Sequence, residues 1–309
     1  MTRAVVVGGA NLDVKARSTA ALEPGTSNPG TTVTAAGGVG RNVAAALALL
    51  GTPTTLVSVV GGDDAGRQVL AETEAAGVDV SLVRRSAPRT GSYTAVLDDQ
   101  GELAVAVADM EASDLVGPEA VLAARRAVSS AGLVVLDGNL RPDALVAALE
   151  LAGEAGAPVV LDPVSAPKAR RLAGALRGRP LHTLSPNTTE LGALVGRDLA
   201  GAAPAELAAA AAGLGDVTHV WVRRGRDGSL LCTAGGRPRQ HARVDGPVVD
   251  VTGAGDAMLA AYCHVVLQGR PLDDAVRLGH LAAAATVASP HTVRPDLRSV
   301  LPLDDRSTP

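Results

Sequence analysis

The chain has 309 residues, of which 47% are hydrophobic and 19% are charged, and this composition excludes a disordered chain. Its 28 basic and 32 acidic side chains leave a formal charge of −4, which argues against a dedicated nucleic-acid binder, because such proteins usually carry a basic excess. Aromatic residues make up 1%, which argues against stacking on aromatic rings as the main way of recognising a base or sugar.

The first 110 residues predict alternating strands and helices, interrupted twice. The expected elements are strands over 4–7 and 54–60 and helices over 40–50 and 64–76. The first interruption, 15–35, is polar and contains prolines and glycines between short strand-like runs. The second, 90–110, predicts a hairpin whose turn is Asp98-Asp99-Gln100-Gly101. Both interruptions are therefore expected to form exposed strands outside the main pattern.

After Asp114 the alternation becomes regular. Helices are expected over 118–130, 142–155, 188–194, 204–213, 257–268 and 271–287, and strands over 133–137, 158–162, 182–185, 219–223 and 229–233. This order predicts an α/β fold with a doubly wound, mainly parallel sheet and helices on both faces. We expect residues 1–14, 36–89 and 112–309 to form this large domain, with 15–35 and 90–111 as a small β lid.

The two cysteines, Cys232 and Cys263, are too few and too far apart for a disulfide framework or a zinc cluster, and they fit a reducing compartment. The N-terminal apolar run reaches Asn11 and Asp13 too early for a signal peptide. No apolar run approaches the roughly 20 residues of a membrane helix. We therefore expect a soluble, cytoplasmic protein.

The strongest chemical signal is the segment 248–258, which predicts a strand end, a turn of small residues and a helix start. Gly253, Ala254 and Gly255 leave the backbone bare, so that several N–H groups and the helix dipole converge on an anion. Asp256 beside such a site is suited to general-base work on a hydroxyl during phosphoryl transfer. The alternative interpretation is that Asp256 only caps the helix.

Four motifs in order resemble the signatures of the ribokinase-like (PfkB) carbohydrate kinases. They are Asp13 after Gly9-Ala10-Asn11, the glycine turn 37–44, the Asn-x-x-Glu motif at 187–190, and 250–256. The resemblance covers essentially the whole chain and implies a kinase with a ribokinase-like sheet and a β lid. It also implies ATP as the phosphoryl donor, Mg²⁺, and activation by a monovalent cation such as K⁺.

The resemblance also implies roles for single residues. Asp256 would be the base, and Gly253, Ala254 and Gly255 the anion hole. Asn187 and Glu190 would lie near the phosphates and Mg²⁺, with Glu190 acting through water, unless Glu190 is an exposed first-turn carboxylate that favours the helix dipole. Asp250 and Thr252 would contribute to a cation loop, and Thr252 would also lie beside ATP.

The donor-site strand departs from the family pattern. It normally ends in Thr or Ser before a glycine turn, and here Arg223 replaces that small hydroxyl. Gly225 and Gly228 fit the turn and are expected at the ATP site. An arginine at this place either grips phosphate or points to solvent, and we expect phosphate contact.

The acceptor is expected to carry a ribose. Asp13, Gly38 and Asn42 form a plausible clamp, because a carboxylate and an amide bind vicinal hydroxyls and Gly38 lets the backbone approach. The alternative is that Asn42 caps a turn and Asp13 pairs with a neighbour.

Several stretches resemble the pseudouridine kinases of this family. They are 27–30, 37–42, 108–110, 162–168 and the valine at 251. The resemblance implies transfer to the 5′-hydroxyl of pseudouridine, whose uracil has an extra ring N–H. The expected uracil contacts are Asn28, Asn139 and Lys168, with Met110 as an apolar lid contact. Lys168 could instead be a solvated lysine on a helix face, and Asn139 a turn residue.

Three other functions remain open. The first is a kinase for another nucleoside or sugar, such as adenosine or ribose, and the second is a non-catalytic nucleoside sensor. The third, a dinucleotide-binding dehydrogenase, is disfavoured because Gly8-Gly9 lacks the full glycine spacing. The partners expected are a small-molecule nucleoside, ATP and, by analogy with the family, a second copy bound through the lid.

Overall fold

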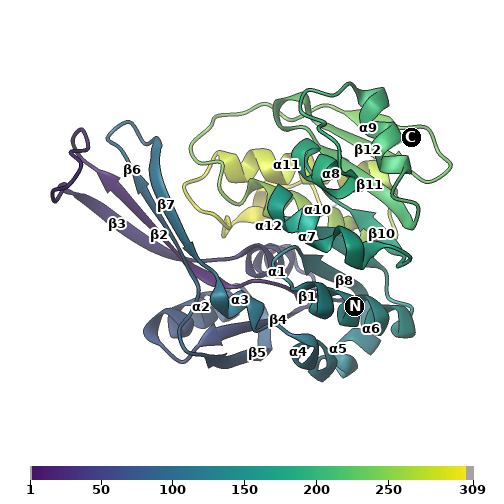
Figure 1. The fold of residues 1–309 in the computed structure, drawn as a ribbon, viewed down its shortest axis with the longest axis horizontal. Helices are drawn as coiled ribbons and strands as arrows, with labels where there is room; N and C mark the ends of the chain where they lie inside the picture. The colour runs from purple at the N-terminus through teal and green to yellow at the C-terminus, as the bar shows by residue number, and fades with distance from the viewer. Residues whose placement is uncertain (1, 304–309) are drawn as a thin grey trace.

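The computed structural model describes residues 2–303, which contain two β-sheets (Figure 1). Within these residues the larger sheet has nine strands in the order β13-β12-β11-β10-β9-β8-β1-β4-β5. They are β1 (Arg3–Val7), β4 (Thr54–Gly61), β5 (Asp79–Ala87), β8 (Ala131–Asp137), β9 (Val159–Asp162), β10 (Leu181–Leu184), β11 (Val217–Arg223), β12 (Ser229–Thr233) and β13 (Arg239–His241). Neighbours from β5 to β11 are parallel, and β12 and β13 join antiparallel. The expected mainly parallel sheet is confirmed.

Helices cover both faces of this sheet. They are α1 (Val39–Leu49), α2 (Asp64–Ala75), α3 (Glu111–Asp114), α4 (Pro118–Ala123), α5 (Arg125–Ser129), α6 (Pro142–Ala155), α7 (Ala166–Leu176), α8 (Thr188–Val195), α9 (Pro204–Ala212), α10 (Ala254–Leu267), α11 (Leu272–Val287) and α12 (Leu297–Val300). None of these helices in the described part of the chain has the length and apolar character needed to cross a bilayer.

Alternate residues of β1 show why its sequence is apolar throughout. Ala4 and Val6 join the core that contains α1, α10 and α11, whereas Val5 and Val7 join the core that contains α4, α6 and α7. A parallel strand that is buried on both faces needs apolar side chains at every position.

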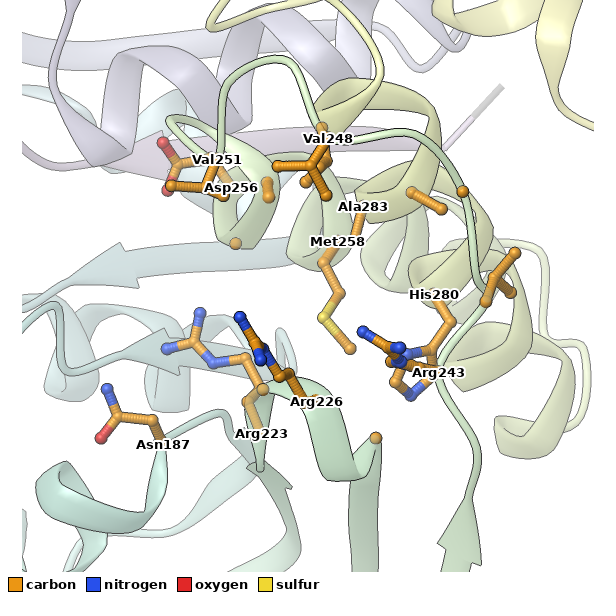
Figure 2. Close-up of a pocket in the computed structure, with 18 of the residues that line it drawn as sticks. Asn187, Arg223, Arg226, Arg243, Val248, Val251, Asp256, Met258, His280 and Ala283 are labelled. Carbon is orange, nitrogen blue, oxygen red and sulfur yellow. The ribbon is translucent and has the colours of Figure 1, made fainter. Parts of the chain in front are cut away.

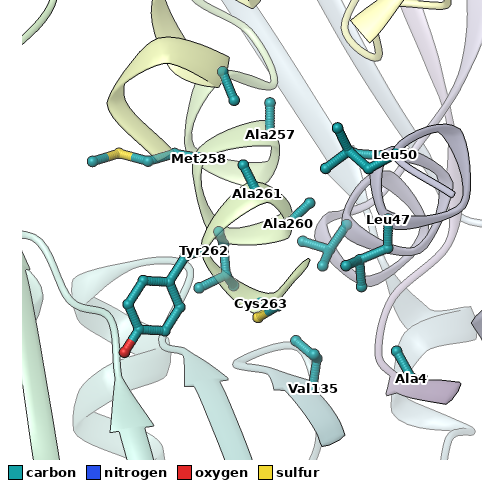
Figure 3. Close-up of a cluster of buried hydrophobic side chains, with 14 of the residues drawn as sticks. Ala4, Leu47, Leu50, Val135, Ala257, Met258, Ala260, Ala261, Tyr262 and Cys263 are labelled. Carbon is teal, nitrogen blue, oxygen red and sulfur yellow. The ribbon is translucent and has the colours of Figure 1, made fainter. Parts of the chain in front are cut away.

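Small side chains fill the core between α1 and α10. Figure 3 shows Ala257 and Ala260 of α10 on the side of Leu47 and Leu50 of α1. Alanines let two helices approach closely, which suits a chain with no phenylalanine. This packing fixes α10, whose N-terminus carries Asp256, against α1, which carries Asn42.

The second sheet has four strands within the described residues, in the order β3-β2-β6-β7. These are β2 (Asn11–Ser18), β3 (Gly30–Gly37), β6 (Ser92–Leu97) and β7 (Leu103–Asp109). It extends from the large domain as a long arm in Figure 1. The two interruptions of the sequence pattern form its strands, but β2 begins at Asn11 and β3 ends at Gly37. The sheet therefore reaches further towards the large domain than the expected lid.

Three of the local differences between expectation and structure have a clear physical reason. The helix expected over 118–130 is divided at Ala124 into α4 and α5. The strand β5 was not predicted, because it is an edge strand with Arg84 and Arg85 in place of an apolar run. The strand end expected near 248–249 does not form, since the amides of Val249 and Asp250 both donate to Val287 O instead of a neighbouring strand.

Candidate active site

The N-terminus of α10 has the backbone geometry that the predicted anion site requires. Gly253 precedes the helix with a φ of 79°, a left-handed conformation that a glycine adopts without strain. The preceding Asp250 supports the turn, because its Oδ1 accepts hydrogen bonds from Thr252 N at 2.9 Å and Thr252 Oγ1 at 2.7 Å. The first amides of a helix lack intrahelical partners. The Ala254 amide donates to Val251 O at 3.4 Å within the turn, and the amides after it face the space before the helix.

Asp256 lies in the first turn of α10 and is partly buried. Asn42 Nδ2 of α1 donates to its Oδ2 at 2.9 Å. Burial raises the pKa of Asp256 to about 7, and the charges of Asp162 and Asp137 add to the rise, although Asn42 and Arg223 oppose it. A carboxylate with such a pKa exchanges protons readily near neutral pH, as a general base requires.

The Arg223 guanidinium points inward from the end of β11, towards α10 (Figure 2). Its Nη1 lies 3.0 Å from Asp162 Oδ2, and its Nη2 lies 3.3 Å from Glu190 Oε2. A Cβ atom added to Gly255 would be 2.9 Å from Nη1, so the guanidinium borders the anion site. Burial favours a neutral arginine, but these carboxylates and Asp256 keep the pKa of Arg223 above its ordinary value. The alternative of a solvent-facing Arg223 is therefore wrong.

Asn187 and Glu190 begin helix α8 as a capping box. Asn187 Oδ1 accepts from Glu190 N at 2.8 Å, while Glu190 Oε2 accepts from Asn187 N at 2.8 Å. The second carboxylate oxygen, Oε1, accepts from Asn187 Nδ2 at 2.8 Å. Glu190 is only 3% exposed, so it is not the exposed first-turn carboxylate of the alternative interpretation.

A cavity of about 610 Å³ opens in front of α10 (Figure 2). Its polar wall includes Asn187, Glu190, Arg223, Arg226, Arg243 and Asp256, and its apolar wall includes Val248, Val251, Met258 and Val287. The predicted Gly225 and Gly228 flank a short 3₁₀ turn on the same wall. A space with three arginines at one side and aliphatic side chains at the other fits a nucleotide. Thr252 does not line it and binds Asp250 instead.

One wall of this cavity connects to the aromatic core. His280 lines the cavity, and its Nε2 is 2.8 Å from Ser229 Oγ. The same hydroxyl accepts from Trp221 Nε1 at 2.9 Å. Burial lowers the pKa of His280 to about 4, so the imidazole is neutral at physiological pH. Hydrogen bonds therefore connect the cavity wall to the single tryptophan, from His280 through Ser229 to Trp221.

On the other side of Asp256, the predicted ribose clamp comes from the lid strand β2 and the start of α1. The Asp13 carboxylate lies against the backbone at Gly37, and its Oδ1 accepts from Asn11 Nδ2 at 2.6 Å. Burial raises the pKa of Asp13 above its ordinary value. Gly38 precedes α1 with a φ of 94°, which L-amino acids rarely adopt. Gly38 O accepts from Asn42 N at 2.8 Å, and the Asn42 side chain in turn contacts Asp256.

A buried network at the end of β8 was missed in the sequence. Asp137 Oδ2 accepts from Gly9 N at 2.9 Å and Gly40 N at 2.7 Å, and its Oδ1 accepts from Asn139 N at 2.8 Å. Lys168 of α7 donates to Asn139 Oδ1. Burial lowers the pKa of Lys168, so it is not the solvated lysine of the alternative interpretation. The position of Asp137, at the carboxyl end of a parallel strand, was the signal that could have found it.

The two remaining predicted substrate contacts, Asn28 and Met110, lie in and beside the lid. Asn28 is exposed in the loop between β2 and β3, where it accepts from Glu23 N at 2.8 Å and donates to Glu23 O at 3.0 Å. The structure does not bring it to α10, because short polar side chains in loops bind their own backbone. Met110 stands between β7 and α3, at the root of the lid.

The carboxylate of the expected cation loop already has partners within the protein. Asp250 Oδ1 accepts from Thr252, and Asp250 Oδ2 lies 2.5 Å from Lys15 Nζ of β2. In the structure the ammonium of Lys15 thus stands beside the Asp250 oxygen that the turn itself leaves open. No group of three or more acidic, histidine or cysteine side chains within residues 2–303 is arranged to hold a metal.

The profile of the "pfkB family carbohydrate kinase" matches residues 1–298. The chain belongs to this family. It is 34% identical over 294 residues to "Pseudouridine kinase" of Escherichia coli K12, covering 95% of this chain and 93% of that protein. As a PfkB-family kinase, it is a phosphotransferase that acts on an alcohol group of a small molecule and uses ATP.

Solved structures agree with the ribokinase-like fold. Arabidopsis thaliana ribokinase complexed with ribose and ATP superposes with a TM-score of 0.82 at 28% identity, covering 97% of each chain. A carbohydrate kinase from Agrobacterium tumefaciens superposes with a TM-score of 0.81 at 33% identity, covering 97% of this chain and 95% of that one.

Proposed function

We propose that this kinase transfers the terminal phosphoryl group of ATP to the 5′-hydroxyl of pseudouridine. The observation that carries the proposal is the position of Asp256, which lines the nucleotide cavity and also accepts a hydrogen bond from Asn42 of the ribose clamp. One carboxylate thus faces both the donor and the acceptor. Similarity to the Escherichia coli pseudouridine kinase over 95% of the chain supports the choice of nucleoside.

In this mechanism Asp256 takes the proton of the 5′-hydroxyl as its oxygen attacks the γ-phosphorus. The amides of Gly253, Ala254 and Gly255 stabilise the charge that develops on the transferred group. Arg223, at the end of the same cavity, contributes a fixed positive charge next to these amides. The lid strands close the acceptor side, which excludes water that would otherwise hydrolyse ATP.

Glu190 fits Mg²⁺ only as an outer contact, because both of its oxygens already accept hydrogen bonds from Asn187. Mg²⁺ commonly keeps several waters and binds phosphates directly. We propose that Glu190 contacts it through water. The ion, when bound with ATP, supplies neutralisation of the phosphate charge.

We assign recognition of uracil to Asn139 and Lys168. They bind each other in the structure, and both are near the buried Asp137. An amide and an ammonium offer a donor and an acceptor pattern that a uracil edge can satisfy. A bare sugar lacks the uracil edge and gains none of these contacts, so ribose should be a poorer substrate.

We also propose a homodimer through the lid. Val105 and Val107 of β7 are more than half exposed and alternate along a regularly paired part of the strand, so they share one face. Val33 of β3 pairs with Lys15 and lies on the opposite face. An exposed apolar face on a sheet is typical of a contact surface. Val105→Glu should produce a monomer in analytical ultracentrifugation, and an unchanged sedimentation coefficient would contradict the proposal.

The kinase proposal is tested with a substrate panel in a coupled assay of ATP consumption. Pseudouridine should have a higher kcat/KM than uridine, adenosine and ribose. Asp256→Asn should leave nucleoside binding nearly intact while kcat falls by about 10²-fold or more, the usual contribution of a general base. A preference for adenosine or ribose would reassign the substrate. Tight nucleoside binding without transfer would indicate a sensor.

A further inference from the structure

One ion pair joins the lid to residues 250–253, the turn before α10, which we call the catalytic turn. Lys15 Nζ on β2 lies 2.5 Å from Asp250 Oδ2, although the two residues are 235 positions apart in sequence. The side chains are 41% and 24% exposed, so solvent reaches the pair but does not separate it. Burial alone would raise the pKa of Asp250. The hydrogen bonds from Lys15 and Thr252 outweigh this effect, so the pKa of Asp250 is lowered and the carboxylate is charged.

Asp250 links this pair to the anion site. Its other oxygen holds Thr252 through both the backbone N–H and the hydroxyl. Thr252 is followed directly by Gly253, the N-cap residue that precedes α10 and orients its first amides. A shift of Asp250 therefore moves the turn from which these amides project.

Charge gives a second reason for the pair. A carboxylate at position 250 lies close to the helix N-terminus that is to receive a triphosphate, and like charges at such a distance repel. The Lys15 ammonium cancels this charge. It stands beside Asp250 Oδ2, an oxygen of the carboxylate that was expected to contribute to a cation loop.

The lid end of the pair is close to the acceptor. Lys15 follows Asp13 by two positions on β2, so both side chains project from the same face of the strand. The strand that offers Asp13 to the sugar is thus the strand that carries Lys15. A movement of β2 towards the large domain would bring Asp13 to the sugar and Lys15 to Asp250 at the same time.

We propose, on the basis of the function proposed above, that Lys15 is a positioning residue that couples closure of the lid to the catalytic turn through Asp250, in place of a soluble cation. The inference assigns no contact between Lys15 and either substrate. Its effect is on how the turn is held when acceptor and ATP are both bound.

The test uses Lys15→Met, Lys15→Arg, Asp250→Asn and the double variant Lys15→Met/Asp250→Asn. We expect kcat to fall by about tenfold in each neutral single variant, the scale of a coupling between sites, and to be largely kept by Lys15→Arg. The double variant should be no worse than the singles, because the two residues act as a unit. Additive losses would overturn the proposal.

Arg17→Ala is the matched control. Arg17 lies on the same strand, but its guanidinium donates to Asp99 O within the lid. Its loss should leave kcat unchanged. An equal loss in Arg17→Ala would mean that any charge removed from β2 has the same effect, and the specific role of Lys15 would be refuted.

Amide hydrogen exchange provides a readout that does not depend on activity. Exchange in the peptide that contains 250–256 should be faster in Lys15→Met than in the wild type, and unchanged in Arg17→Ala. Unchanged exchange in Lys15→Met would refute the positioning role of Lys15, even if the enzyme is a pseudouridine kinase. If no nucleoside is phosphorylated, the proposed function fails, and the exchange result still decides whether Lys15 holds the turn.

A change of salt completes the experiment. The wild-type rate should be the same in KCl and NaCl, because Lys15 already occupies Asp250. Strong activation of the wild type by K⁺ would show that a soluble cation orders the turn, and it would overturn the assignment of that role to Lys15.

Discussion

Activity should depend on pH through Asp256. Its pKa of about 7 means that about 9% of the carboxylate is ionised at pH 6 and about 91% at pH 8. A general base works only when it is deprotonated, so kcat/KM should be lost as the pH falls and should rise about tenfold from pH 6 to pH 8. An aspartate with the ordinary pKa of 3.8 would give a flat profile over this range.

The measurement is kcat/KM for the nucleoside at saturating ATP, in overlapping buffers from pH 5.5 to 9. With ATP saturating, this parameter reports ionisations of the enzyme–ATP complex before the nucleoside binds. Asp256→Asn should leave a low rate with no step near pH 7. A wild-type midpoint near pH 4 would refute the argument that burial controls this carboxylate.

Arg223 provides a matched perturbation of the same profile. Its charge lowers the pKa of Asp256, so Arg223→Met should move the midpoint to higher pH as well as weaken ATP binding. Arg226 lines the same cavity but is not among the charges that shift Asp256. Arg226→Met should therefore affect ATP binding with the midpoint unchanged. Equal midpoints in the two variants would show that the Arg223 charge does not lower the pKa of Asp256.

Three further outcomes are expected. Lys168→Ala should reduce kcat/KM for pseudouridine more than for ribose, and equal losses in the substrate panel would refute a role in reading uracil. Val164 is the single non-glycine residue in 2–303 with a positive φ (70°). Val164→Gly should raise the melting temperature, because relief of about 1–3 kcal/mol of strain exceeds the roughly 0.5–1 kcal/mol of unfolded-chain entropy that a glycine costs. An unchanged melting temperature would contradict this. Because the pKa of Asp256 is raised in the folded state, its contribution to stability is fully present below pH 3.8 and is lost as the pH rises through 7. Asp256→Asn should therefore stabilise the fold by up to about 4 kcal/mol at pH 8 and by far less at pH 4. Denaturant titrations at the two pH values would measure this difference.

Features that depend on neighbouring residues could be predicted from the sequence. The turn 253–255 and Asp256 are contiguous, and the glycine that begins α10 is visible in the sequence. The alternation of strands and helices likewise gave the sheet, since parallel strands that are buried on both faces read as apolar runs. The two polar interruptions located the strands of the lid, because they stand out from the apolar runs of the main sheet.

Features that depend on distant residues could not be predicted. The inward direction of Arg223 is set by Asp162 of β9 and Glu190 of α8, which meet only after the sheet has formed. The pairing of Lys15 with Asp250 has no local signal at either position. Asn28 shows the opposite error, because a motif placed it at the substrate while its own loop offered nearer backbone partners.

The lone tryptophan provides a built-in optical reporter. Trp221 is buried and stacks on Tyr262 with ring centroids 4.8 Å apart, and Ser229 connects its indole to His280 at the cavity wall. Indole emission responds to the polarity and hydrogen bonding around the ring. The intrinsic fluorescence of the unlabelled protein should thus follow occupancy of the nucleotide cavity in real time, without contributions from any second indole to subtract.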